Sequence, residues 1–140
     1  MTIVLDSGAV IASERNDARF AALLAAARKK RVSMLLPATV VAETWRGPST
    51  HPRAARLLGS IDGFPELDLS AARRAGALLA RSGTAAIVDG NVVDVAIAMR
   101  PSTIVTSDPG DVIELLQAAG ISHELFGSRS PKADVVIIPL

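Results

Sequence analysis

The chain has 140 residues, of which 49% are apolar and only 3% aromatic, a composition that suits one domain of helices packed on a buried sheet. Cysteine is absent and only two histidines, His51 and His123, are present, so disulfides, thiolate metal sites and a histidine-built zinc centre are excluded or unsupported. The net charge of +1 is small for a protein that binds nucleic acid through an overall basic charge.

Two strands and a helix are predicted in the first 36 residues. Residues 2–5 form an apolar run that ends in Asp6, which predicts a buried parallel strand followed by a polar loop. Residues 17–30 carry apolar side chains at helical spacing and end in a basic cluster, which suits the end of a helix. Residues 32–36 are predicted as the second strand.

The middle of the chain is predicted to be mostly helical. Pro37 begins a short helix that carries Glu43 and ends before a Gly-Pro pair, and a further helix is predicted over residues 50–58. Residues 64–69 alternate apolar and polar side chains, the pattern of a strand near the sheet edge. A helix is then predicted over residues 70–83, with a glycine at its end.

The last third of the chain returns to alternating helices and strands. A helix is predicted over residues 91–99, a strand over 103–106, a helix between residues 109 and 120, and a closing strand over 134–138. Strands that alternate with helices predict an α/β fold with a mainly parallel central sheet. We therefore expect a three-layer sandwich of about five strands with helices on both faces.

Four acidic residues fall at positions that predict a shared site. Asp6 and Asp108 follow strands, and the carboxyl ends of parallel strands meet at one edge of a sheet. Glu43 and Asp94 lie inside apolar helical segments, where an isolated buried carboxylate needs a cation. Helix capping alone explains the first pair but not the second. Four carboxylates suit a hard ion such as Mg²⁺ or Mn²⁺, and this points to phosphodiester chemistry.

Four segments resemble, in chain order, the four acidic motifs of the PIN domain. They are Ile3–Ala9, Pro37–Glu43, Val92–Ala98 and Ile104–Asp108, and together they span nearly the whole chain. The size of the chain is similar to that of VapC toxins from VapBC type II toxin–antitoxin systems. The resemblance implies one PIN domain over residues 1–140 with a PIN-like three-layer sandwich.

The resemblance also implies an activity and partners. It implies an endoribonuclease that depends on Mg²⁺ or Mn²⁺, cleaves RNA phosphodiester bonds and is neutralised by a cognate VapB-like antitoxin. A homodimer is implied, which would form a heterotetramer or larger assembly with the antitoxin. Thr106 or Ser7 would support the acids by hydrogen bonding. The implied catalytic and metal-binding residues are Asp6, Glu43, Asp94 and Asp108.

Several residues near these motifs keep alternative interpretations. Asp89 is a competing third acid, which would project about 140° away from Asp94 on one helix; we prefer Asp94 and regard Asp89 as auxiliary. Asp111 could join the metal site, although an acid in the first turn of a helix is favourable there without a metal. Arg46 could contact an RNA phosphate or simply be a solvated cation.

Other functional classes receive less support from the sequence. No P-loop and no G-x-G-x-x-G motif is present, which argues against nucleotide binding. An acidic-pocket binding or signalling domain without nuclease activity, either PIN-like or receiver-like, is the alternative, but Asp6 lacks a paired acid. No long apolar run or signal peptide is present, so we expect a cytoplasmic protein without a membrane partner. Basic residues gather at residues 28–31, at Arg53 with Arg56, and at Arg73 with Arg74. They could form a positive rim around the acidic centre, although the cluster at residues 28–31 is also explained by compensation of the helix dipole.

Overall fold

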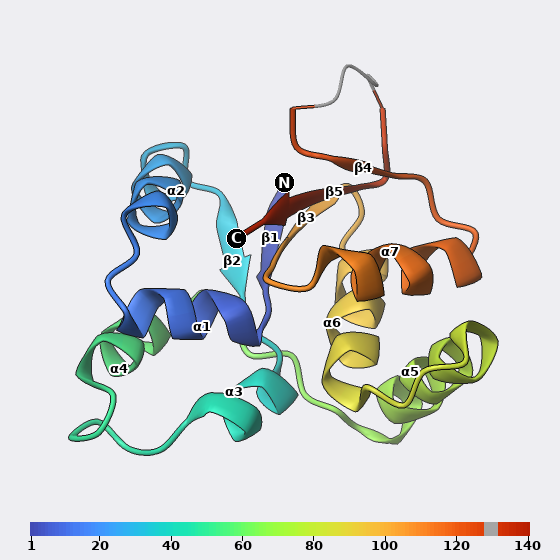
Figure 1. Cartoon of the computed structure of the whole chain (residues 1–140), viewed down its shortest axis with the longest axis horizontal. Helices are drawn as coiled ribbons and strands as arrows, with labels where there is room; N and C mark the ends of the chain where they lie inside the picture. The colour runs from blue at the N-terminus through green and yellow to red at the C-terminus, as the bar shows by residue number, and fades with distance from the viewer. Residues whose placement is uncertain (128–131) are drawn as a thin grey trace.

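A five-stranded sheet, in which every strand runs parallel to its neighbours, forms the centre of the molecule (Figure 1). The computed structural model describes residues 1–127 and 132–140. The strand order is β2-β1-β3-β5-β4, so the predicted parallel α/β fold is confirmed. The strands are β1 (Thr2–Leu5), β2 (Ser33–Leu35), β3 (Ser102–Thr106), β4 (His123–Leu125) and β5 (Val135–Pro139).

Helices flank the strands on both sides, as expected for a three-layer sandwich. In Figure 1, α1, α2 and α4 lie to one side of the strands, and α5, α6 and α7 lie to the other. None of the helices in the described part of the chain has the length and apolar character needed to cross a membrane. The helices are α1 (Ser7–Glu14), α2 (Ala18–Lys29), α3 (Ala38–Thr44), α4 (Pro52–Leu58), α5 (Leu69–Ser82), α6 (Ile87–Ala98) and α7 (Pro109–Ala118).

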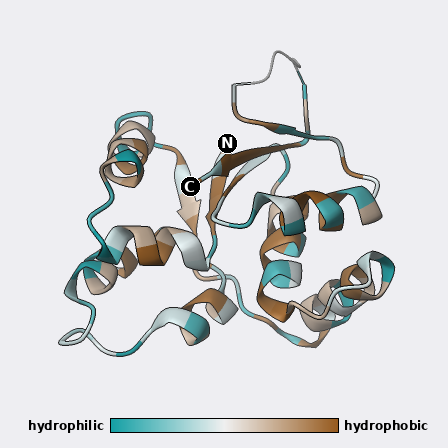
Figure 2. Cartoon of the chain, viewed as in Figure 1, coloured by the Kyte–Doolittle hydropathy of each residue, from teal (hydrophilic) through white to brown (hydrophobic). Residues whose placement is uncertain are grey.

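The two central strands, β1 and β3, are buried along their whole length. Helices cover both faces of a parallel sheet, so its central strands need apolar side chains on both sides. Val4, Leu5, Ile104 and Val105 accordingly have no exposed surface, and Figure 2 shows hydrophobic residues along the central strands. This core fixes the strand ends from which the acidic residues project.

Three local predictions differ from the structure. Residues 64–69 do not form a strand: only an isolated bridge joins Leu35 to Gly63, and the Pro65 carbonyl accepts from the Ala38 N–H at 2.9 Å. A proline has no N–H to donate to a strand ladder. The strand beside β5 is instead β4, whose three residues are too few and too polar for the pattern to reveal. The segment after Asp6, predicted as a loop, is helix α1.

The start of α1 packs directly against the segment that follows β3. A Cβ atom added to Gly8 would lie 2.3 Å from Ser107 Oγ, 2.5 Å from Ser107 Cβ and 2.9 Å from Ser107 N. Only glycine allows this approach without displacing the backbone of the neighbouring segment. Gly8 therefore brings the residues after β1 next to the residues after β3.

Substitution of Gly8 with alanine is predicted to destabilise the protein by about 1–3 kcal/mol, because the added methyl group overpacks this contact. Gly76→Ala is the matched control, since a Cβ at Gly76 in α5 would meet no heavy atom within 4 Å. That control should stabilise by about 0.5–1 kcal/mol through its higher helix propensity. Urea denaturation measures both changes, and equal stability of the two variants would contradict the prediction.

Candidate metal-binding site

Asp6 and Asp108 each follow one of two neighbouring strands, β1 and β3, which pair in parallel. Asp6 comes directly after β1, and Asp108 comes two residues after β3. The strands are in parallel register with Leu5 opposite Val105, and the Asp6 N–H donates to the Val105 carbonyl at 3.2 Å. Both acids therefore stand at the carboxyl edge of the sheet, as the sequence predicts.

Hydrogen bonds fix Asp6 rigidly. Its side chain is 4% exposed and accepts from the Ala9 N–H at 3.2 Å, so that it caps α1. The Thr106 hydroxyl donates to Asp6 and accepts from the Asp108 N–H at 2.9 Å. Burial raises the pKa of Asp6, while the hydrogen bonds oppose that shift. Thr106 thus links the two strand-end acids.

Glu43 reaches the same region from α3. It lies in the last turn of that helix and is exposed. The Ser7 hydroxyl donates a short hydrogen bond to Glu43 Oε2. Because Ser7 follows Asp6, this bond ties Glu43 to the start of α1 and holds it beside the carboxyl edge of the sheet.

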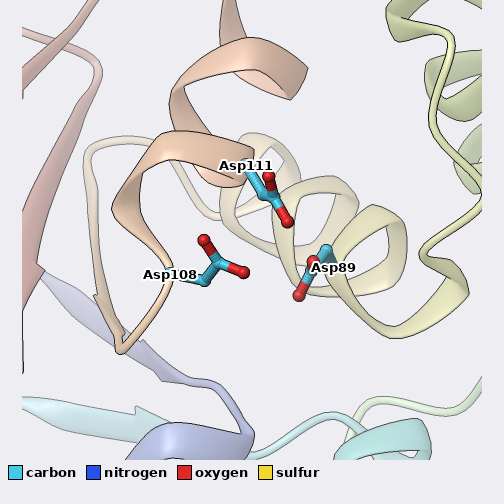
Figure 3. Close-up of side chains that lie close together, drawn as sticks. All are labelled: Asp89, Asp108 and Asp111. Atoms are coloured by element: carbon cyan, nitrogen blue, oxygen red, sulfur yellow. The ribbon is translucent and has the colours of Figure 1, made fainter.

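Asp89, Asp108 and Asp111 form a compact group of carboxylates. Each offers an oxygen atom that lies within 4.8 Å of the others, and the close-up in Figure 3 shows the three side chains facing a common space. Asp89 comes from the first turn of α6, whereas Asp108 precedes α7 and Asp111 lies in its first turn. Three carboxylates at this spacing are able to bind one hard cation.

The negative charges of four other acids act on Asp89. The pKa of Asp89 is raised to about 6, first by burial and then by the negative charges of Asp111, Asp108, Asp6 and Glu43. The pKa of Asp111 is also raised, mainly through its hydrogen bond and charge interaction with Asp108. The four other carboxylates therefore lie near enough to interact electrostatically with Asp89 at their centre, and we call this group of five the acidic pocket.

Asp94 lies elsewhere on α6, although the sequence analysis preferred it as the third acid. Asp94 is buried, with 6% exposure of the residue, and both of its carboxylate oxygens accept from Arg74 Nε on α5, at 3.0 and 3.3 Å. It is not among the charges that act on Asp89. The structure therefore supplies Asp94 with an arginine partner and does not bring it together with Asp6, Glu43 and Asp108.

Two solved structures resemble this chain over nearly its full length. A chain of VapBC2 from Rickettsia felis, bound to a DNA fragment from the promoter, matches with a TM-score of 0.62 and 12% identity, over 100% of this chain and 99% of that one. A chain of FitAB bound to the IR36 DNA fragment matches with a TM-score of 0.62 and 18% identity, over 98% and 94%. The chain has the PIN fold. No protein-family model and no curated protein sequence matches it.

The direction of α6 in this PIN fold explains why Asp89, and not Asp94, reaches the acidic pocket. A helix that leads into a parallel strand begins at the carboxyl edge of the sheet and ends at the amino edge. Asp94 is five residues further along than Asp89, which is about 7.5 Å along the helix axis. The sequence analysis began this helix at residue 91, whereas α6 begins at Ile87; an earlier start would have placed Asp89 in the first turn.

The basic cluster at residues 28–31 does not surround the acidic pocket of the PIN fold. Arg28 and Lys29 end α2, and the chain enters β2 at Ser33, so the cluster lies at the amino edge of the sheet. The acids stand at the opposite edge. The cluster therefore does not flank the acids directly, although Arg28 also lines a cavity beside α1 and α4.

The metal-free protein is predicted to lose stability as the pH rises. The pKa of Asp89 is about 6 in the folded state and ordinarily 3.8, so between these values the folded state binds more protons than the unfolded state. The free energy of unfolding therefore falls as the pH increases from about 4 to about 6. Asp89→Asn should reduce this fall and be more stable than the wild type near neutral pH.

Urea denaturation in EDTA at several pH values measures this effect. Asp17→Asn is the matched control, because it removes one carboxylate outside the acidic pocket and asparagine still caps α2. That control should retain the wild-type pH dependence. The interpretation fails if Asp89→Asn and Asp17→Asn respond to pH in the same way.

Proposed function

We propose that the chain is a Mg²⁺- or Mn²⁺-dependent endoribonuclease and acts as the toxin of a toxin–antitoxin pair. The observation that carries the proposal is the acidic pocket, whose five carboxylates have no cationic side chain among them. Within residues 1–127 and 132–140 the only ion pair joins Arg74 to Asp94, outside this pocket. A divalent cation supplies the missing positive charge, and an all-oxygen ligand set suits Mg²⁺ or Mn²⁺.

The residues of the pocket would hold such an ion and orient the RNA. A bound divalent ion supplies activation of water and neutralises charge on the phosphate and the leaving oxygen. Asp89, Asp108 and Asp111 offer converging oxygens, and Asp6 adds a buried carboxylate fixed by Thr106. Rigid ligands of this kind keep the ion in place without reorganisation during the reaction.

Asp89 takes the place of Asp94 in this proposal. Three of the four acids predicted from the sequence, Asp6, Glu43 and Asp108, remain in the set that we propose for catalysis and metal binding. Asp94 instead joins α6 to α5 through Arg74. The proposed set is Asp6, Glu43, Asp89, Asp108 and Asp111.

The proposed partners rest on the fold and on the names of the similar structures. Both similar chains belong to assemblies named as pairs, VapBC2 and FitAB. We propose by analogy that this chain binds a cognate VapB-like antitoxin. The RNA substrate is proposed because a carboxylate-bound Mg²⁺ typically acts on phosphate groups.

The Asp89→Asn and Asp94→Asn variants test the proposed site directly. Asp89→Asn should lower metal-dependent RNA cleavage on the order of a hundredfold or more, because losing a few kcal/mol of transition-state stabilisation has that effect. Asp94→Asn should be less stable but should retain cleavage and Mg²⁺ binding when folded. Cleavage of total RNA, with mapping of the ends in Mg²⁺ and in EDTA, measures activity, and calorimetric titration with Mn²⁺ measures binding.

If Asp94→Asn lost cleavage and metal binding while Asp89→Asn retained both, the third acid of the site would be Asp94. Absence of cleavage by the folded wild type with either metal would refute the nuclease proposal itself.

We also propose that the protein forms a homodimer in solution. Val40 in α3 and Leu57 in α4 are buried in the core, so they are not available to a dimer interface. Large apolar side chains are nevertheless exposed at Trp45, Leu69 and Ile87, by 39%, 67% and 59%. Covering such residues favours association. Sedimentation at micromolar concentration should therefore show a dimer, and a monomer would contradict the proposal.

A further inference from the structure

Arginine side chains line a cavity that begins beside the acidic pocket. This cavity, which we call the near cavity, has a volume of about 420 Å³ and includes Ser7 and Glu43 in its lining. Arg15, from the end of α1, and Arg46, from the segment after α3, line the same space. The near cavity therefore connects the acids to two cationic groups.

A second cavity lies between α2 and α4 and carries three more arginines. This far cavity has a volume of about 210 Å³ and is lined by Arg28 from α2 and by Arg53 and Arg56 from α4. Arg28 donates to Ser60 Oγ at 2.9 Å. Because this partner is uncharged, the guanidinium keeps its full charge for a ligand.

Neighbouring residues of α1 and of α4 line the two cavities, which therefore lie on different sides of these helices. Ser13 lines the far cavity and its neighbour Glu14 lines the near cavity. On the facing helix, Arg53 lines the far cavity and Ala54 lines the near cavity. Arg53 Nη1 also donates to the Glu14 carbonyl at 3.2 Å. A surface path from Glu43 past α1 to the groove between α2 and α4 would cross this contact between α1 and α4.

The acids along this path do not neutralise the arginines. Glu14 accepts from the Ala54 N–H at 2.8 Å, and Asp17 accepts from the Phe20 N–H at 2.8 Å. Both carboxylates thus serve the N-terminal ends of helices. No arginine of the path forms an ion pair with a described residue, since Arg74–Asp94 is the only such pair there. The arginines of this path, which we call the arginine track, are Arg15, Arg46, Arg53, Arg56 and Arg28.

We propose that the arginine track binds the phosphates of the RNA strand where that strand leaves the acidic pocket. The inference rests on the proposed nuclease function. A strand that is cut in the pocket continues beyond it, and its next phosphates need cations that the pocket lacks. Guanidinium groups bind phosphate oxygens through two parallel hydrogen bonds. The near cavity shares Glu43 with the acidic pocket, and this shared residue favours the substrate strand over a separate acidic protein as the ligand.

Binding of short and long RNA by a double variant tests the track. Arg53→Gln combined with Arg56→Gln removes two charges from the far cavity, and Arg73→Gln combined with Arg81→Gln removes two from α5 as the matched control. Fluorescence anisotropy would be measured over a range of salt with unstructured RNAs of about five and about twenty nucleotides, in an Asp108→Asn background so that the RNA is not consumed. The slope of log affinity against log salt reports the number of phosphate contacts, at about 0.7 per contact for single strands.

The far-cavity variant should bind the long RNA roughly tenfold more weakly, with a slope smaller by about 1.4 for two lost contacts. Its binding of the short RNA should not change. Arg28→Gln, on α2, provides an independent test of the same cavity and should reduce the slope by about 0.7. The α5 control should leave both RNAs unaffected.

Three results would overturn the inference: an unchanged slope for the long RNA, an equal loss in the α5 control, or a loss of binding to a glutamate-rich peptide without a loss for RNA. The last result would assign the track to a protein partner. Cleavage of the short RNA by the wild type with Mg²⁺ tests the nuclease proposal separately, because this assay involves no substitution in the arginine track. The two proposals can therefore fail independently.

Discussion

Repulsion among the carboxylates at the carboxyl edge of the sheet is the constraint on which the rest of the structure depends. Two unit charges 4 Å apart repel by about 4 kcal/mol at an effective dielectric constant of 20, and Asp89, Asp108 and Asp111 approach one another within 4.8 Å. The raised pKa of Asp89 is one consequence, because protonation relieves part of the repulsion. The buried strands β1 and β3 offset the remaining cost, and a divalent cation would remove it.

The parallel topology lets a small chain gather these acids from distant parts of its sequence. Every crossover returns to the same edge of the sheet, so the ends of β1 and β3 and the starts of α6 and α7 all meet there. Short polar contacts then set the side chains: Thr106 joins Asp6 to Asp108, and Ser7 holds Glu43. Thr106 ends β3 two residues before Asp108, and Ser7 directly follows Asp6, so the two paired strands bring both hydroxyl groups to the acids.

The sequence was sufficient for the sheet and for the strand-end acids, because a buried parallel strand leaves a clear apolar run. It was insufficient to distinguish a buried acid that pairs with an arginine from a buried acid that belongs to the metal site. Asp94 satisfied the criterion of an acid in an apolar helix, yet its cation is Arg74, twenty residues away on another helix. Asp89 looked less constrained because the predicted helix began too late. The strand His123–Leu125 was missed because it is polar, and residues 64–69 were misjudged because Pro65 interrupts the ladder.

The net charge of +1 conceals a strong separation of charge within the fold. The acids occupy the carboxyl edge of the sheet, whereas five arginines line the cavities between α1, α2 and α4. Opposite charges that cancel in the total still produce local potentials, and those potentials determine where a charged ligand binds. A polyanion would be repelled by the metal-free pocket and attracted by the arginines beside it. Loading of the pocket with a divalent ion would reduce the first effect and leave the second unchanged, so that metal binding would favour the approach of a polyanion to the pocket.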